Sequence, residues 1–309
     1  MTRQKIRIAT RKSKLALWQA SFIRDRLHDA HPNIAVELLE MTTQGDKWLS
    51  SPLSQIGGKG LFIKELEQAL LDDAADIAVH SMKDVPATLP EGFCMPVIAY
   101  RADIRDALVG STMATAVQRL PPGAIVGSSS LRRQAQLLHR RPDVIVKPVR
   151  GNVGTRLEKL DAGDYDAIIL AAAGLKRLGL ESRISEYMSV EESLPAAGQG
   201  ALGIECRSDY SDMDLLEALS DHEVFTCVSA ERRVSEGLGA DCSMPLAAYC
   251  IREGEQLLLQ AILADQTGKT LLRASARGHD WQALGSEVTD KLLQQGAEDI
   301  LQSLTDASS

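Results

Sequence analysis

The chain twice repeats an alternation of short apolar runs and amphipathic segments. In the first stretch, apolar runs at 5–9, 35–41 and 77–80 enclose segments at 13–27 and 61–71 whose apolar residues recur at helical spacing. Strands and helices that alternate in this way are typical of βαβ units with a buried, mostly parallel sheet. The pattern predicts one α/β lobe at the start of the chain.

After a turn-rich stretch at 102–122 the same rhythm returns, which predicts a second lobe. Its expected strands and helices lie at 125–126, 128–141, 144–149, 153–162 and 167–170. Two βαβ lobes imply a cleft between them, because loops at the carboxyl ends of their strands face the crevice.

The pattern changes again toward the carboxyl end. An apolar run at 202–206 predicts a strand that returns to the first lobe. Beyond residue 220 we expect a smaller α/β domain with a helix at 222–236, strands at 246–251, 256–263 and 271–276, and one helix at about 281–304. The predicted domains are 1–99 with 201–219, 100–200, and 220–309.

Composition limits the kind of protein. The 309 residues suffice for two or three cores, and with aromatic residues at 4% these cores must be aliphatic. The cysteines are odd in number and form no CxxC pair, which argues against a disulfide framework and a metal site and favours a reducing cytoplasm. The chain starts without an apolar signal segment, and its longest apolar stretch is too short to cross a membrane. The cysteines are Cys94, Cys206, Cys227, Cys242 and Cys250.

Charge is distributed unevenly. The net charge is −8, yet Gly127 to Arg177 contains ten lysines and arginines against five aspartates and glutamates. This asymmetry favours a small polyanionic ligand held in one basic cleft. Nucleic acid fits less well, since its binders spread a basic face over a basic domain.

Arginines recur at three expected junctions between a strand and a helix. Free N–H groups and the dipole at a helix N-terminus favour an anion, and arginine binds planar carboxylates or phosphates through two hydrogen bonds. Ordinary helix caps with surface arginines are the alternative. The junctions carry Arg11 with Ser13, Ser128, Ser129 and Ser130 with Arg132 and Arg133, and Arg150 with Arg156.

A lysine and a carboxylate stand side by side at the end of an expected strand. Lys83 and Asp84 follow the run at 77–81 and precede Pro86, which stops further regular structure. Asp84 suits a catalytic acid in an arginine-lined cleft, or equally a turn carboxylate satisfied by backbone N–H groups.

Three glycine-rich segments match known motifs but fail on context. The GxGxxG match at 198–203 opens a strand instead of a helix, and the segment at 57–60 lacks the residues of a P-loop. The GxxG at 151–154 lacks the basic, aromatic surroundings of an RNA-binding module. Cys242, in the loop at 239–245, reads from position alone as an inert buried thiol.

Six segments in one order resemble the porphobilinogen deaminase family, and the resemblance extends from Ile6 to about Leu301. They are RIATR at 7–11, GGKGLF at 57–62, VHSMKDVP at 79–86, SLRRQ at 130–134, RGNVGTR at 150–156 and LPAAGQG at 194–200. The resemblance implies two periplasmic-binding-protein-like lobes around a cleft and a smaller α/β domain that carries the cofactor cysteine.

The resemblance also implies an activity. Members of this family join four porphobilinogen molecules head to tail, with loss of ammonia, and release hydroxymethylbilane for tetrapyrrole and haem biosynthesis. A dipyrromethane cofactor, attached through a thioether at the position of Cys242, starts the chain. Each pyrrole unit carries two carboxylates, which agrees with the arginine-rich loops.

Site residues follow from the matching positions. Asp84, assisted by Lys83, is implied as the catalytic group that promotes loss of ammonia, stabilises the cationic azafulvene-like intermediate and handles the released proton. The implied cofactor-binding residues are Ser81, Lys83, Asp84, Ser128, Ser129, Ser130, Arg132, Arg133, Asp46 and Cys242. The implied substrate-binding and chain-binding residues are Arg11, Ser13, Arg150, Arg156, Arg177, Gln199 and Lys59.

Four positions depart from the family pattern. Gln55 stands where a lysine is common, and Ser128 replaces a frequent threonine. Ala240 and Asp241 replace two glycines before Cys242, and the carboxylate is expected to raise the thiol pKa and so to affect cofactor loading.

Other functions predict features that this sequence lacks. A solute-binding protein for a small polycarboxylate would need an export signal and has no use for Asp84 or a tethering cysteine. A regulatory ligand-binding domain would bring a helix-turn-helix segment. We therefore expect a monomeric cytoplasmic enzyme that binds neither metal, membrane nor nucleic acid and passes its product to the next enzyme.

Overall fold

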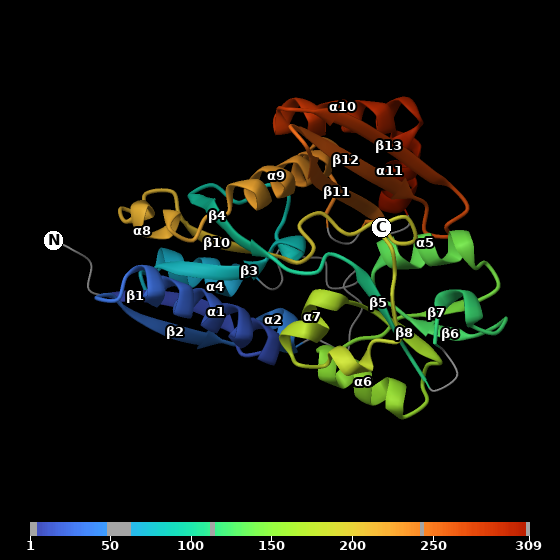
Figure 1. Ribbon diagram of the computed structural model, residues 1–309, viewed down its shortest axis with the longest axis horizontal. Helices are drawn as coiled ribbons and strands as arrows, with labels where there is room; N and C mark the ends of the chain where they lie inside the picture. Colours follow the sequence, from blue (N-terminus) through green and yellow to red (C-terminus); the bar gives the residue numbers. More distant parts are fainter. Residues whose placement is uncertain (1–4, 48–62, 112–114, 242–243, 307–309) are drawn as a thin grey trace.

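Three β-sheets organise the part of the chain that the structure describes (Figure 1). The computed structural model describes residues 5–47, 63–111, 115–241 and 244–306. Two five-stranded mixed sheets have the orders β2-β1-β3-β10-β4 and β7-β6-β8-β5-β9, and a three-stranded sheet has the order β11-β12-β13. The predicted α/β class, with two larger lobes and a smaller third domain, is confirmed.

The first lobe contains the parallel strands β1, β2 and β3, with β10 antiparallel to β3 and to the edge strand β4. Helix α1 buries Ala20, Ile23 and Leu27 against this sheet, and Ser13 caps it by accepting the Ala16 N–H at 3.3 Å. The elements are β1 (Lys5–Arg11), α1 (Lys14–Ala30), β2 (Ala35–Met41), α2 (Gln44–Lys47), α4 (Lys64–Leu71), β3 (Ile77–Ser81), β4 (Phe93–Arg101), β10 (Ala201–Arg207) and α8 (Met213–Glu217).

The second lobe repeats this arrangement. Strands β6, β7 and β8 are parallel, and β5 runs antiparallel to β8 and β9. Aliphatic clusters cover both faces of the sheet, around Leu137 and Ile169 on one and Leu157 and Ile168 on the other. The elements are β5 (Asp106–Gly110), β6 (Ile125–Gly127), α5 (Leu131–Arg140), β7 (Ile145–Lys147), α6 (Val153–Asp161), β8 (Ala167–Ala171), α7 (Ala172–Arg177) and β9 (Glu186–Tyr187).

The chain crosses between the lobes twice, and the crossings lie side by side. One joins β4 to β5 at 102–105, and the other joins β9 to β10 at 188–200. The Ala102 N–H donates to the Gly200 carbonyl at 3.0 Å. Gly200 has φ +85°, and a Cβ there would lie 2.8 Å from the Ala102 oxygen, so only glycine permits this approach.

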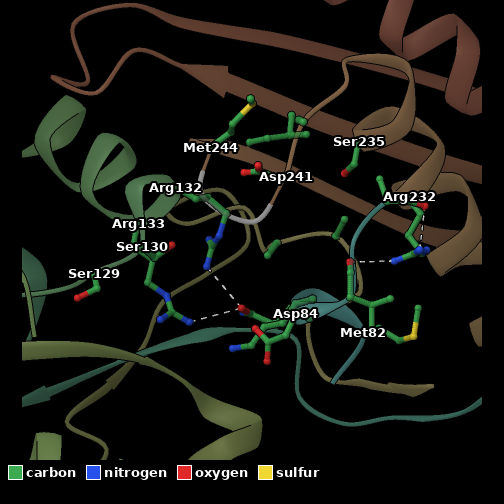
Figure 2. A pocket seen from close by; sticks show the side chains of 18 of the residues that line it. Met82, Asp84, Ser129, Ser130, Arg132, Arg133, Arg232, Ser235, Asp241 and Met244 are labelled. Atoms are coloured by element: carbon green, nitrogen blue, oxygen red, sulfur yellow. Dashed lines mark hydrogen bonds between the residues drawn. The ribbon is translucent and has the colours of Figure 1, made fainter. Parts of the chain in front are cut away.

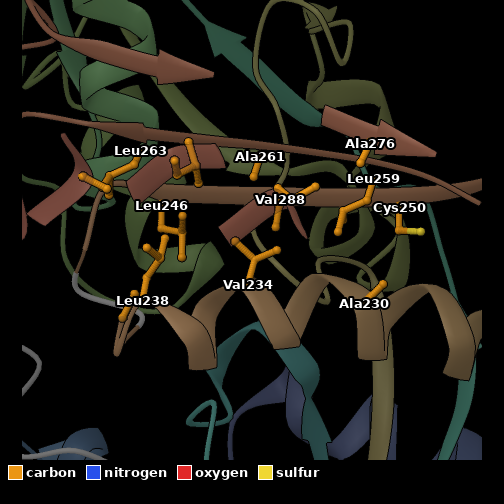
Figure 3. Packing of buried hydrophobic residues seen from close by; sticks show 14 of the residues in the cluster. Ala230, Val234, Leu238, Leu246, Cys250, Leu259, Ala261, Leu263, Ala276 and Val288 are labelled. Carbon is orange, nitrogen blue, oxygen red and sulfur yellow. The ribbon is translucent and has the colours of Figure 1, made fainter. Parts of the chain in front are cut away.

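The third domain packs helices on one face of an antiparallel meander (Figure 3). Ala230 and Val234 of α9, with Leu238 directly after it, share a core with Leu246, Cys250 and Leu259 of the sheet and Val288 of α10. The elements are α9 (His222–Gly237), β11 (Leu246–Glu253), β12 (Gln256–Ala264), β13 (Leu271–Gly278), α10 (Trp281–Gln294) and α11 (Ala297–Asp306).

Two expectations about elements were wrong. The single helix at 281–304 is two helices, because the chain turns at Gly296, whose φ is +94°. The stretch at 102–122, expected to be turns, contains the strand β5. The unexpected β4 contains Pro96, which removes a backbone donor; β4 tolerates it as an edge strand.

Candidate active site

A cavity of about 290 Å³ lies where the three domains meet (Figure 2). The first lobe contributes the turn after β3, the second contributes α5 and the loop before α6, and the third contributes α9 and the loop before β11. Of the predicted site residues, those that line it are Lys83, Asp84, Ser129, Ser130, Arg132, Arg133, Arg150, Arg156 and Gln199.

The turn that carries Lys83 and Asp84 is anchored on both sides. Met82 is 1% exposed and packs in a cluster that includes Val85, and the Val85 N–H donates to the Met82 carbonyl at 3.2 Å. These contacts fix a single turn of 3₁₀ helix, Met82–Asp84. Asp84 itself is exposed within the cavity wall, below Arg132 and Arg133 in Figure 2.

An arginine of the third domain donates hydrogen bonds to the residues that follow this turn. Arg232 of α9 donates to the carbonyls of Val85 at 3.3 Å, Pro86 at 2.7 Å and Ala87 at 2.9 Å. Burial lowers the pKa of Arg232. The loop after Asp84 is therefore bonded to the helix that leads toward residue 242.

Burial and several neighbouring charges act on Lys83. Burial lowers its pKa to about 8, and Arg133 and Arg132 act in the same direction, while Asp84 opposes the shift. A lysine with this pKa is largely protonated at neutral pH and loses its charge on modest alkalinisation.

The two arginines at the start of α5 share one buried carboxylate. Asp106, the first residue of β5, is 0% exposed and lies 2.8 Å from Arg132 Nη2 and 2.8 Å from Arg133 Nη2. Burial alone would raise the Asp106 pKa, but the two guanidinium charges outweigh it and hold the pKa well below its usual range. The arginine pair is thus half neutralised before any ligand binds.

One donor of this pair is left without a partner. Arg132 Nη1 donates to the Leu194 carbonyl at 2.6 Å and Nη2 to Asp106, but Nε is buried and bonds to none of the described residues. An unsatisfied buried N–H is costly, and the guanidinium groups of the pair line the cavity. The donor set fits an anionic cofactor or substrate.

The loop before α6 and the helix itself each add a further cation, Arg150 and Arg156. Asn152 caps α6 by accepting the Thr155 N–H at 3.0 Å, and Arg156 Nε donates to the Gly151 carbonyl at 2.8 Å. Burial, together with the charges of Arg133 and Arg150, lowers the Arg156 pKa to about 10. The repulsion among these cations is relieved when an anion binds.

Gln199 joins the cavity to the crossing segment at 188–200. Its Nε2 donates to the Ile104 carbonyl at 2.6 Å and to Asp106 Oδ1 at 3.0 Å. The neighbouring Gly198 has φ +71°, and a Cβ there would lie 2.6 Å from Met82 Cβ. The GxGxxG match at 198–203 therefore reflects close backbone packing against the Asp84 turn.

Five predicted residues lie outside the wall of this cavity, as far as the structure describes it. Ser81 accepts from Gln19 at 2.8 Å, and Ser13 caps α1. Ser128 is buried and accepts the Ser130 N–H at 3.3 Å, and Arg11 ends β1. Arg177 donates to the Gly200 carbonyl at 2.7 Å and lies over the Trp18 ring at 5.4 Å, and burial lowers its pKa to about 10.

Some predicted positions fall outside the described residues. Cys242, Lys59 and Gln55 belong to undescribed segments, and of Asp46 only the backbone, in α2, is described. Ala240 and Asp241, which precede Cys242, line the cavity, and Figure 2 shows Asp241 across it from Asp84. The loop that leads to Cys242 therefore opens onto this site.

Sequence reasoning missed Asp106 and Arg232. Asp106 lies in the stretch read as turns, and the pairing of two adjacent arginines with one distant carboxylate leaves no local signal. Arg232 lies on a helix whose neighbours only the fold reveals. Along the described chain, no group of three or more histidine, cysteine or acidic side chains is arranged to hold a metal, and no helix is long and apolar enough to span a membrane.

The fold and cavity define a class: a two-lobed α/β protein with an added domain and a cation-lined cavity where all three meet. Family models identify the member of this class. Residues 6–215 match the porphobilinogen deaminase, dipyromethane cofactor binding domain, and residues 225–294 match the porphobilinogen deaminase C-terminal domain. The chain belongs to the porphobilinogen deaminase family.

Membership confirms the predicted activity and cofactor. The chain is a transferase of tetrapyrrole synthesis with hydroxymethylbilane synthase activity, its substrate is porphobilinogen, and its cofactor is dipyrromethane.

Two solved structures to which this chain shows some similarity are binding proteins. The methionine binding protein MetQ is 11% identical, with a TM-score of 0.46, and the match covers 72% of this chain and 92% of that one. The periplasmic aliphatic sulphonate binding protein SsuA from Escherichia coli is 12% identical, with a TM-score of 0.44 and coverage of 76% and 70%.

Proposed function

We propose that Asp84 is the catalytic carboxylate of this synthase. Its turn is held by Met82 and Arg232, and its side chain lines the same cavity as Arg132 and Arg133. This shared cavity is the observation that carries the proposal. Asp84 assists departure of ammonia from the aminomethyl arm, stabilises the cation that this leaves on the pyrrole, and accepts the proton shed after the next bond forms.

The cations around Asp84 hold carboxylates. Lys83, Arg132 and Arg133 bind those nearest to the reacting carbon, and Arg150 and Arg156 bind those of units already joined. The lowered pKa of Arg156 supports anion binding at this end of the cavity, because an anionic partner relieves the repulsion from Arg133 and Arg150. Ser129, Ser130 and Gln199 add hydrogen bonds, and we keep Ser81, Ser128, Arg11, Ser13, Arg177, Asp46 and Lys59 as further ligand contacts.

We propose that dipyrromethane is tethered to Cys242 through a thioether. The flanking Asp241 and Met244 line the cavity, which supports a tether that reaches it. When bound, the cofactor supplies the pyrrole carbon to which the first substrate unit is joined. Lys83, Asp84, Ser129, Arg132 and Arg133 are the residues placed to hold it.

Three further assignments concern the domain boundaries, the location and oligomeric state of the enzyme, and the fate of its product. The division into 1–99 with 201–219, 100–200, and 220–309 is supported by the three sheets. We also propose that the enzyme is a cytoplasmic monomer whose product passes to the next enzyme of the pathway.

Mass spectrometry tests the tether. Intact denatured protein should exceed the mass of the chain by two porphobilinogen units less two ammonias, and peptide mapping should locate the excess on Cys242. The variant Cys242→Ser should lack the excess, and Cys94→Ser, a matched control far from the tether in sequence, should keep it. Excess mass that persists in Cys242→Ser would reject the attachment site.

A further inference from the structure

Asp106 is the most heavily bonded carboxylate of the site, although it does not line the cavity. Arg133 Nε donates to its Oδ1 at 2.9 Å and Arg132 Nη2 to the same oxygen at 3.1 Å. Gln199 Nε2 donates at 3.0 Å, and the Ser193 hydroxyl donates to Oδ2 at 2.7 Å. These donors come from α5 and from the crossing segment at 188–200, so one carboxylate joins both.

These bonds restrict how the arginines can turn. Two donor nitrogens of Arg132 are committed to Leu194 and Asp106. Arg133 is committed to Asp106, Gln199 and the Ile169 carbonyl, the last at 3.3 Å. The orientation of the pair is therefore decided by acceptors of the protein, before a ligand arrives.

Charge adds a second effect. Two guanidinium groups and one carboxylate carry a net charge of +1 together, whereas the arginines alone would carry +2 in a buried setting. Uncompensated, they would repel each other and attract any available anion. With Asp106 present, binding depends on geometry as well as on charge.

We propose that Asp106 is a positioning residue for carboxylate recognition: it orients Arg132 and Arg133 in the wall of the cavity and halves their excess charge. This inference rests on the proposed function of the cavity. In this role Asp106 favours the binding of porphobilinogen, which must place two carboxylates while its aminomethyl arm reaches Asp84, over the binding of a compact anion that is attracted by charge alone.

The test compares Asp106→Asn with Asp103→Asn. Asp103 lies three residues earlier and pairs with Arg105 at 2.8 Å and Lys176 at 2.9 Å, but contributes nothing to the cavity wall. We expect Asp106→Asn to raise the KM for porphobilinogen at least tenfold and to tighten competitive inhibition by inorganic phosphate at least threefold. Asp103→Asn should leave both values unchanged. An unchanged KM in Asp106→Asn, or equal shifts in both variants, would overturn the proposal.

Two further measurements keep the test decisive. If Asp106→Asn does not fold, Ser193→Ala removes one hydrogen bond to Asp106 without changing the charge. A KM raised about threefold at constant kcat supports the positioning role, and an unchanged KM rejects it.

If the wild-type protein has no turnover, the proposed function fails separately. Phosphate should then raise the melting temperature of Asp106→Asn more than that of wild type, and equal shifts would reject the positioning role.

Discussion

Arg101 and Glu231 form a two-pronged ion pair between β4 and α9, with Nη1 to Oε1 at 2.7 Å and Nη2 to Oε2 at 3.1 Å. Glu231 is 0% exposed and also accepts the N–H groups of Gly198 at 2.7 Å and Cys250 at 2.8 Å. One carboxylate thus connects the first lobe, the crossing segment and the third domain.

Glu231→Gln should lower the free energy of unfolding by about 3–5 kcal/mol, because it leaves the Arg101 charge buried without a counter-ion. Urea unfolding monitored by circular dichroism measures this change. Glu236→Gln, on the same helix but in an exposed pair with Arg233, should change the free energy by less than about 0.5 kcal/mol. Equal effects of the two variants would contradict the interdomain role.

Asp84→Asn should lower kcat by about 10²- to 10⁴-fold, the range expected when a general acid–base group is lost. Its free energy of unfolding should stay within about 0.5 kcal/mol of wild type, since the side chain is exposed. Ammonia release and urea unfolding check the two quantities. Near-normal turnover would remove Asp84 from the catalytic role.

The charge of Lys83 should make substrate binding depend on pH. Because its pKa is about 8, the KM for porphobilinogen should rise as pH increases through 8 and the cation is lost. Lys83→Arg keeps a charge at these pH values and should flatten the rise. A profile of KM against pH that is the same in both proteins would show that another group titrates.

The lowered pKa of Lys83 has a different consequence for stability: it makes the free energy of unfolding increase with pH. The folded-state pKa of Lys83 lies below its unfolded value of 10.5, so between pH 8 and 10.5 the unfolded state binds more protons. The contribution of Lys83 to the free energy of unfolding therefore rises with pH across this window. Wild type should gain stability relative to Lys83→Met there, measured by urea unfolding at several pH values.

Gly198→Ala should destabilise the fold more than its backbone angle alone explains. A new Cβ would meet Met82 Cβ at 2.6 Å, next to the Asp84 turn. Gly123→Ala is the matched control, because Gly123 has φ +77° and no atom within 4 Å of the new Cβ, so it should cost only about 1–2 kcal/mol. A larger loss in Gly198→Ala, with reduced kcat, is expected; equal losses would exclude the clash.

The α/β class could be predicted from the sequence, because the period of apolar residues in α1, β3 or α9 reflects local geometry that needs no partner. Its motifs also identified Lys83, Asp84, Arg132, Arg133, Arg150 and Arg156, which the fold brings to one cavity. Two strands escaped detection: β4 contains Pro96, which argues against a strand, and the short β5 is held by pairing with β8 and β9.

The interaction partners of these residues depend on how the chain folds in three dimensions. Asp106 meets Arg132 and Arg133, and Arg232 meets the turn after Asp84, through contacts between residues far apart in sequence. Burial and the charges of neighbouring domains set the pKa values of Lys83 and Arg156. Local sequence predicts local geometry, whereas desolvation and long-range ion pairs depend on where the folded chain places each group.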